Sequence, residues 1–234
     1  MIPLRDINPR STFPIVTLLL IATNVLMFLF QLSLGPEPGM RFAFAYGMIP
    51  ARVQVALGGG QVGLAQAVAP LVTSIFLHGG FLHLIGNMWF LWVFGDNVED
   101  RLGHLRYLVF YLLTGVGAGV VHTVFNWDST VPAVGASGAI SGVMGAYAVL
   151  FPRSRVVTLV PLVIFWFTAN IPAIVMIGYW FVLQFLSGMA SLNAASPNAG
   201  GVAWWAHIGG LVLGVILVFV LRRPRRPAVT YYVE

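Results

Sequence analysis

A serine in a glycine-rich segment has the surroundings that nucleophilic catalysis needs. Ser137 lies between Gly135-Ala136 and Gly138-Ala139, and these small neighbours would let a substrate backbone approach its hydroxyl. If a helix begins here, its free backbone N–H groups favour an anion and could form an oxyanion hole. A serine hydroxyl becomes a good nucleophile only when a base takes its proton, and histidine is the usual base.

Three other side chains could complete such a site. His207 lies in the first turn of the last apolar run of the chain. His83 and Asn87 lie four residues apart in an earlier apolar run, which places both on one face of a helix. The pattern indicates a site assembled from separate helices, with Ser137 as nucleophile and His207 as base.

The composition indicates where these helices lie. Of the 234 residues, 59% are apolar and 8% are charged, against roughly 45–50% and 25% in an average soluble domain. So few charges cannot cover a globule of this size, which excludes a soluble enzyme; a disordered or collagen-like chain is excluded too. We therefore expect an integral membrane protein. The absence of Cys excludes disulfides, thiol nucleophiles, zinc fingers and iron–sulfur clusters.

Hydropathy leaves a choice between six and seven spanning helices. A span needs about 20 largely apolar residues. The stretch 156–192 is too long for one span, and it is broken by Pro161 and by Asn170–Pro172. It could span twice, giving seven helices in all, or once over Pro172–Gly188, giving six. The five plain runs are Phe13–Leu32, Phe81–Val98, Leu105–Phe125, Ser137–Pro152 and Trp204–Leu221.

The positions of the arginines favour six. With six helices, ten of the 12 basic residues, all Arg, lie on one side of the membrane, and only Arg41 and Arg52 lie on the other. This asymmetry obeys the positive-inside rule and makes both termini cytoplasmic. Arginines at the ends of apolar runs also argue against a nucleic-acid partner. The segment Val156–Thr168 becomes an apolar connector, packed on the bundle or lying in the interface.

We thus expect an all-α membrane protein with a six-helix bundle in a single domain, residues 1–234. The N-terminus (1–12) is cytoplasmic and short, and the C-terminal tail (222–234) is basic. The long outer loop, about residues 33–80, is too apolar for an ordinary solvated loop and is expected to fold partly into the membrane. No inverted half-and-half symmetry is visible, which weakens a transporter interpretation.

This topology places the candidate residues at one depth. The second, fourth and sixth helices all enter from the outer side, so His83 with Asn87, Ser137 and His207 share the outer half of the bilayer. Ionisable groups at such depth are costly and are functional candidates. No acidic residue lies in an apolar run at this level, and Asp128 in the outer loop is the nearest. We therefore expect a Ser–His dyad and no Ser-His-Asp triad.

Small residues predict how the serine and histidine helices meet. Gly138, Gly142 and Ala146 repeat every four residues, as do Gly210 and Gly214. Small residues at this period let two membrane helices approach closely. The fourth and sixth helices can thus bring Ser137 and His207 within hydrogen-bond reach.

Other assignments compete with these. Ser141 faces roughly the same side as Ser137, and we interpret it as a packing residue. His122, near the outer end of the third helix, is a competitor for the base, although an interfacial role beside Trp127 fits it better. A metal site at His78 and His83 is disfavoured, because the chain has no HExxH motif and no carboxylate nearby.

At this point the chain resembles the rhomboid family of intramembrane serine proteases. The resemblance runs from the Arg5 region to about Leu221, and its three motifs occur in order on the expected helices. They are Gly135-Ala136-Ser137-Gly138, then Ala206-His207-Ile208-Gly209-Gly210 with Gly214, and His78 with His83 and Asn87.

The resemblance implies a function. It makes Ser137 the nucleophile, His207 the general base, and Asn87, His83 and the Ser137 N–H the oxyanion hole; His78 lies near the mouth of the site. Members cut transmembrane substrates near the outer membrane surface without metal or cofactor. The fifth helix and the loop after it would be the substrate gate and cap.

The sequence departs from the family pattern in two places. Many members have a Trp-Arg pair in the first outer loop, and none occurs between Ser33 and His78. Some members have a Tyr that packs on the catalytic histidine, where this chain has Ser141. His207 must then be oriented by other residues, for which Trp204 and Trp205 are candidates. Gln184 and Trp180 in the fifth helix are expected to be packing residues, although Trp180 could line the gate.

Two other functions compete with that of a protease. A rhomboid-like pseudoprotease that binds transmembrane segments would be expected to lack the serine or the histidine, and this chain has both. A transporter or channel predicts midplane charges or matching broken helices, and neither is seen. All-arginine usage and the lack of a transit peptide fit a bacterial inner membrane.

Overall fold

The computed structural model describes residues 1–162, 165–192 and 202–222. Most of the basic tail predicted from the sequence, and the loop after the fifth predicted helix, therefore lie outside the described residues. Within them, each of the six predicted apolar runs is a helix. These helices are α1 (Ile15–Ser33), α6 (Phe81–Leu102), α7 (His104–Phe125), α8 (Ser137–Leu150), α9 (Ala173–Leu192) and α10 (Trp204–Leu221).

The described helices differ in how readily they could span a membrane. The helices α1, α7, α9 and α10 are each long and apolar enough, which makes four candidate spans. A fifth arises if α6 is joined across a 77° bend to the apolar segment Leu64–Phe76 before it. Helix α8 has 14 residues, or roughly 21 Å, so it is short for a full span. The helical positions match the prediction, whereas the number of membrane crossings is not fixed by them.

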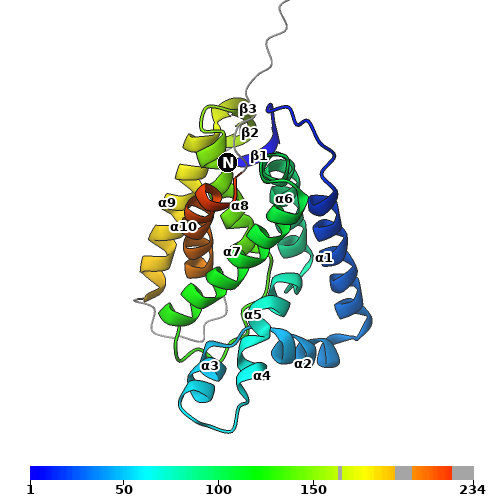
Figure 1. Ribbon diagram of the computed structural model, residues 1–234, viewed down its shortest axis with the longest axis vertical. Helices are drawn as coiled ribbons and strands as arrows, with labels where there is room; N and C mark the ends of the chain where they lie inside the picture. Colours follow the sequence, from blue (N-terminus) through cyan, green and yellow to red (C-terminus); the bar gives the residue numbers. More distant parts are fainter. Residues whose placement is uncertain (163–164, 193–201, 223–234) are drawn as a thin grey trace, which may run out of the picture.

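The predicted outer loop is itself largely helical. It contains α2 (Pro36–Tyr46), α3 (Pro50–Leu57), α4 (Leu64–Val68), α5 (Pro70–Thr73) and the short 3-10 helix η1 (Ser74–Phe76). These helices gather at one end of the bundle, opposite the end that carries the N-terminus (Figure 1). Met48 in this loop pairs with Ala133 in an isolated antiparallel bridge. The loop is thereby tied to the segment that leads into α8.

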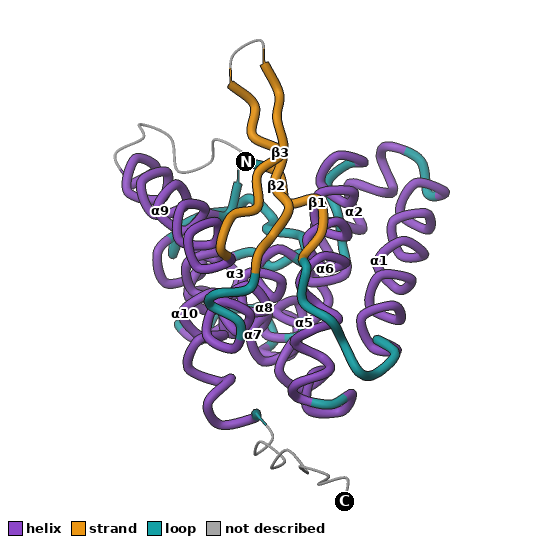
Figure 2. The backbone as a smooth tube through the Cα atoms, turned by 90° about the horizontal axis from the view of Figure 1, so that it is seen from above, coloured by secondary structure: helices purple, strands orange, loops and turns teal. Residues whose placement is uncertain are grey.

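The fold departs from an all-α bundle at the end that carries the N-terminus. Strands β1 (Ile2–Asp6), β2 (Arg155–Leu162) and β3 (Phe165–Pro172) form an antiparallel sheet in that order. The β2–β3 hairpin reaches sideways beyond the helices (Figure 2). The expected connector is therefore a hairpin, because β-branched and aromatic residues favour strands and buried Val156 and Thr158 alternate with more exposed neighbours. Hydropathy alone shows this segment as an apolar run and does not reveal its period of two.

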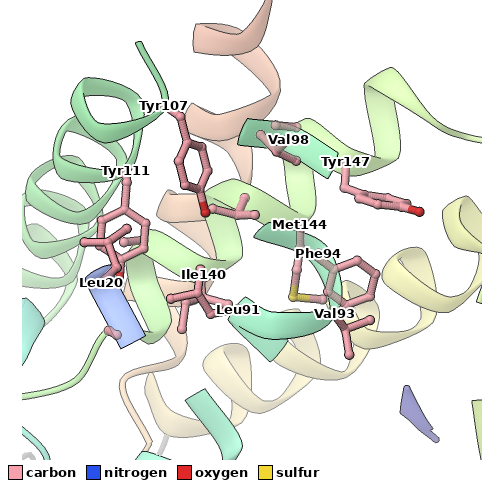
Figure 3. Packing of buried hydrophobic residues seen from close by; sticks show 14 of the residues in the cluster. Leu20, Leu91, Val93, Phe94, Val98, Tyr107, Tyr111, Ile140, Met144 and Tyr147 are labelled. Carbon is pink, nitrogen blue, oxygen red and sulfur yellow. The ribbon is translucent and has the colours of Figure 1, made fainter. Parts of the chain in front are cut away.

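Aromatic and aliphatic side chains fill the centre of the helix bundle. The core labelled in Figure 3 joins α6, α7 and α8, with Leu20 contributed by α1. Tyr107, Tyr111 and Tyr147 are fully buried within it. Phe94 and Tyr147 meet edge to face with their ring centroids 5.1 Å apart. Since the nucleophile candidate is the first residue of α8, this core fixes the helix on which it stands.

A buried carboxylate holds α1 against α6. Glu99 is fully buried, and its oxygens accept hydrogen bonds from the backbone N–H groups of Val16 and Thr17, each at 2.8 Å. The Thr17 hydroxyl donates to it at 2.7 Å and His104 Nδ1 lies 2.6 Å away. The side chain on α6 thus satisfies donors in the first turn of α1 that no intrahelical carbonyl can reach.

The close approach of α8 and α10 confirms the prediction from their small residues. A Cβ atom on Gly210 would overlap the carbonyl oxygen of Gly138, and one on Gly214 would overlap the backbone of Gly142. The contact continues at Gly145, which faces the carbonyl of Leu211. Only glycine permits backbones to meet this closely along the helix pair that carries the serine and the histidine.

Candidate active site

A cavity of about 730 Å³ opens among α6, α7, α8, α9 and α10, and the segment before α10 also lines it. Its lining includes four of the residues that the sequence analysis singled out, contributed by three helices. The residues are His83, Asn87, Ser137 and His207. The structure therefore brings together side chains that are up to 124 positions apart in the chain, counted from His83 to His207. The cavity also contains the predicted competitor His122 and the gate candidate Trp180.

The serine stands at an uncapped helix start. Ser137 is the first residue of α8, and no side chain caps that end of the helix. The N–H groups of the first turn have no intrahelical acceptor, so the cavity receives both a hydroxyl and backbone donors at this point. A Cβ atom on the next residue, Gly138, would lie 3.7 Å from the carbonyl oxygen of Ala206. The chain neighbours of Ser137 and His207 thus lie close to each other.

His207 is held on several sides. Its side chain is 8% exposed, and its Nδ1 lies 2.7 Å from Gln184 Oε1 in α9. The Trp180 ring lies with its centroid 5.6 Å from the imidazole, and the Trp204 ring meets it edge-on at 6.3 Å. Trp205 instead stacks on Phe125. No hydrogen bond joins Ser137 to His207 in the part of the chain that the structure describes.

The contact with Gln184 corrects one expectation. We expected Gln184 to be a packing residue, but it is the hydrogen-bond partner of His207. The sequence carried a signal that could have identified it, because a lone amide in an apolar helix is costly unless it has a polar partner. Gln184 also lies four residues after Trp180 and therefore on the same helix face.

His83 and Asn87 lie beside the loop that precedes the serine. Gly135 has a φ of +131°, and a Cβ atom there would lie 2.7 Å from His83 Nε2 and 3.5 Å from Asn87 Nδ2. A side chain larger than glycine would therefore be strained and would displace the imidazole. The Asn87 side-chain nitrogen is buried and donates to no acceptor among the described residues. It is a free donor beside the loop that leads to the nucleophile candidate.

His78 lies behind His83 and does not line the cavity. The two imidazole rings meet edge to face with centroids 5.2 Å apart. The backbone of His78 is held on both sides by Gln31 in α1, whose amide donates to the His78 carbonyl and accepts from its N–H. His78 is thus placed to support His83.

The two competing residues have other hydrogen-bond partners. The Ser141 side chain is 1% exposed and its hydroxyl donates to the Ser137 carbonyl at 2.6 Å. His122 Nδ1 accepts from the Asn126 amide at 3.4 Å. The same amide nitrogen donates to the His122 carbonyl at 2.9 Å, so the contacts of His122 are made within its own helix end. Among the described residues, no group of three His, Cys, Asp or Glu side chains could hold a metal ion.

The fold and the cavity define a polytopic integral membrane protein whose helices enclose a pocket lined by serine, histidine and asparagine. Comparison with known families gives the same class a name. A model of the Rhomboid domain matches residues 65–224, more than half of the chain. The chain belongs to the rhomboid family.

Individual relatives are similar over the same region. The chain is 34% identical over 160 residues to the rhomboid protease GluP of Bacillus subtilis, covering 68% of this chain and 27% of that protein. It is 31% identical over 151 residues to the mitochondrial RHOMBOID-like protein 6 of Arabidopsis thaliana, covering 64% and 43%. The chloroplastic Rhomboid-like protein 11 of the same plant is 32% identical over 158 residues, covering 65% and 52%. The chain spans about half of the length of these relatives or less.

Proposed function

We propose that the chain is an intramembrane serine endopeptidase that cuts transmembrane proteins near the outer membrane surface. The observation that carries the proposal is that one cavity is lined by Ser137 at an uncapped helix start, by His207 from α10 and by Asn87, whose amide nitrogen is unpartnered. Nucleophile, base and oxyanion donor are the three parts that acyl transfer requires. Family membership and the similarity to a named rhomboid protease support the same class of reaction.

In the proposed reaction His207 Nε2 accepts the proton of the Ser137 hydroxyl as Oγ attacks the scissile carbonyl. The developing oxyanion accepts hydrogen bonds from the Ser137 N–H, Asn87 and His83. His207 then gives its proton to the leaving amine, and an acyl-enzyme on Ser137 remains. A water molecule, deprotonated by the same imidazole, hydrolyses this ester and releases the serine. The Ser137 to His207 hydrogen bond is expected to form with substrate present, because such bonds are often long in free enzymes.

The competing base fits this scheme less well. His207 Nδ1 lies opposite an amide oxygen, which can only accept, so Nε2 keeps its lone pair. His122 has the opposite arrangement, with Nδ1 opposite an amide nitrogen. Of these two histidines, His207 is therefore the one that is prepared to take a proton.

The proposal extends to the surroundings of the site. The partners would be transmembrane substrate proteins within the lipid bilayer, with no nucleic acid, metal or cofactor, and α9 would form the gate. His78 would support His83 from behind, and Gly135 would admit the substrate backbone. For location we propose a bacterial inner membrane with both termini cytoplasmic. The similar proteins include one from Bacillus subtilis and others named mitochondrial or chloroplastic.

The test is cleavage of a transmembrane reporter co-expressed with the wild-type chain or with Ser137→Ala. The wild type is expected to release the ectodomain, whereas Ser137→Ala is expected to release none. A serine-reactive covalent probe should label the wild type alone. Equal release by both proteins would end the proposal, and binding of the reporter without release by the wild type would favour a pseudoprotease.

A further inference from the structure

The imidazole of His207 has a polar partner from another helix. Gln184 Oε1 lies 2.7 Å from His207 Nδ1, and both residues are only 8% exposed. None of the acidic residues that the structure describes lines this cavity; they are Asp6, Glu37, Asp96, Glu99, Asp100 and Asp128. The position that a triad gives to an acid is thus taken by a neutral amide.

The chemistry of the pair determines the protonation of the ring. An amide oxygen accepts hydrogen bonds and cannot donate, so Nδ1 must carry the proton of the neutral imidazole. The lone pair then lies on Nε2, the nitrogen that a base needs for the serine proton. In serine proteases with a triad, the aspartate likewise selects the tautomer and orients the ring. A neutral amide can do both, although it stabilises the imidazolium less than a carboxylate would.

The same helix face provides a second contact. Trp180 lies one turn before Gln184 in α9, and its ring packs on the imidazole with centroids 5.6 Å apart and an interplanar angle of 36°. The hydrogen bond fixes the direction of Nδ1, and the indole restricts rotation of the ring. The two contacts together hold His207 from α9. They would take the place of the orienting tyrosine of some rhomboids, since this chain has Ser141 at that position.

We propose that Gln184 is a positioning residue, which selects the Nδ1-protonated tautomer of His207 and aims Nε2 at Ser137. This inference rests on the proposed function for its effect on rate, whereas its effect on the tautomer is independent of activity. Gln184 touches the base and not the substrate, so its loss is expected to slow turnover and to leave substrate binding nearly unchanged.

The tautomer can be measured directly in the purified full chain. Nitrogen-15 spectra of histidine-labelled protein in detergent micelles, with His207→Asn used to assign the signal, distinguish a protonated Nδ1 from a protonated Nε2. The wild type is expected to show His207 protonated at Nδ1, and Gln184→Leu is expected to show a mixture. A wild-type ring protonated at Nε2 would overturn the proposal, whatever the fate of the variant.

Kinetics provide the second readout. Gln184→Leu keeps the approximate volume and removes the acceptor, so kcat is expected to fall about 10- to 100-fold with KM nearly constant, less than the roughly 10⁴-fold seen when a triad aspartate is replaced. Gln184→Glu restores an acceptor oxygen and should recover most of the rate. The same change at an exposed glutamine on α4, Gln66→Leu, should match the wild type.

The outcomes separate the two proposals. If Ser137→Ala is inactive but Gln184→Leu turns over at the wild-type rate, the positioning role is wrong and the protease stands. If Ser137→Ala is as active as the wild type, the proposed function fails, and the spectra still decide the tautomer. A rise in KM with kcat unchanged would also contradict the positioning role, because it would place Gln184 in substrate binding.

Discussion

Gly210 packs directly on the backbone carbonyl of Gly138, so α10 and α8 meet without any side chain between them. Gly138 follows Ser137 in the chain, and Gly210 lies one turn after His207. The distance between the hydroxyl and the imidazole is therefore set by a backbone contact. Backbone atoms cannot rotate aside as a flexible side chain can, which makes this contact a sensitive point of the site.

A methyl group at this contact should impair both stability and activity. Gly210→Ala must push α10 away from α8, and overpacking of this kind typically costs about 1–3 kcal/mol. Cleavage of a transmembrane reporter should fall with it, because Ser137 and His207 move apart. Thermal unfolding in detergent and initial cleavage rates measure the two effects.

Gly178 in α9 offers a matched control. A Cβ atom at Gly178 would meet nothing within 4 Å, so Gly178→Ala should unfold and cleave like the wild type. If Gly210→Ala behaved like Gly178→Ala, the close contact between α8 and α10 would not set the site.

Removing the side-chain amide of Asn87 should slow the proposed reaction without abolishing it. Asn87 Nδ2 has no acceptor among the described residues, and the proposed oxyanion would provide one. Loss of one oxyanion donor typically lowers kcat by ~10²–10³, so Asn87→Ala should show this loss with KM almost unchanged. Steady-state kinetics measure both constants. Asn170→Ala, at an exposed position on β3, is the control; a raised KM with normal kcat for Asn87→Ala would instead assign Asn87 to substrate binding.

His207 and His122, which both line the cavity, should respond differently to substitution. His207→Ala should lose activity, because the proton of Ser137 then has no acceptor. His122→Ala should keep most of it, since the polar contacts of His122 are with Asn126 and not with the residues around Ser137. Reporter cleavage by the two variants, at matched expression, decides the point. The reverse order of activities would make His122 the base.

Much of the helical frame could be predicted from the sequence, because membrane helices carry their signal in local composition. Apolar runs located the helices α1, α6, α7, α8, α9 and α10, and the glycine period predicted that α8 and α10 meet closely. These features depend on the chemistry of neighbouring residues along one helix. The same reasoning placed Ser137, His207, His83 and Asn87 at one level, and the structure finds all four on one cavity.

What could not be predicted depends on pairing between distant segments. The sheet requires β1 at the N-terminus to pair with β2, some 150 positions later, and Ile2 faces Leu159 in that pairing. Hydropathy alone cannot separate a strand from an apolar helix segment in such a run. Gln184 was missed for a similar reason, because its meaning depends on the position of His207 in another helix.

The last prediction concerns this sheet and its carboxylate Asp6. Asp6 accepts hydrogen bonds from the Tyr147 hydroxyl at 2.7 Å and from the Asn97 amide at 2.8 Å, which ties β1 to the far ends of α8 and α6. Burial raises the pKa of Asp6 from 3.8 to about 6, because the charged form loses solvation, although the Tyr147 bond acts in the opposite direction. The folded protein therefore binds this proton more tightly than the unfolded chain does.

The sign of the pH dependence follows from that difference. Below about pH 4 the carboxyl group is neutral in both states, and its contribution to stability is fully present. As the pH rises from about 4 through 6, the unfolded chain ionises first, so the free energy of unfolding falls. Asp6→Asn replaces the carboxyl group with an amide that does not ionise. Across that range the free energy of unfolding of the variant should therefore rise relative to the wild type by about 1 kcal/mol, a value reduced for partial exposure to solvent.

Denaturation in detergent at a series of pH values measures this difference, with Asp128→Asn in the outer loop expected to follow the wild type. A constant difference between Asp6→Asn and wild type from pH 4 to 7 would contradict this prediction, because it would show that Asp6 ionises alike in the folded and unfolded states.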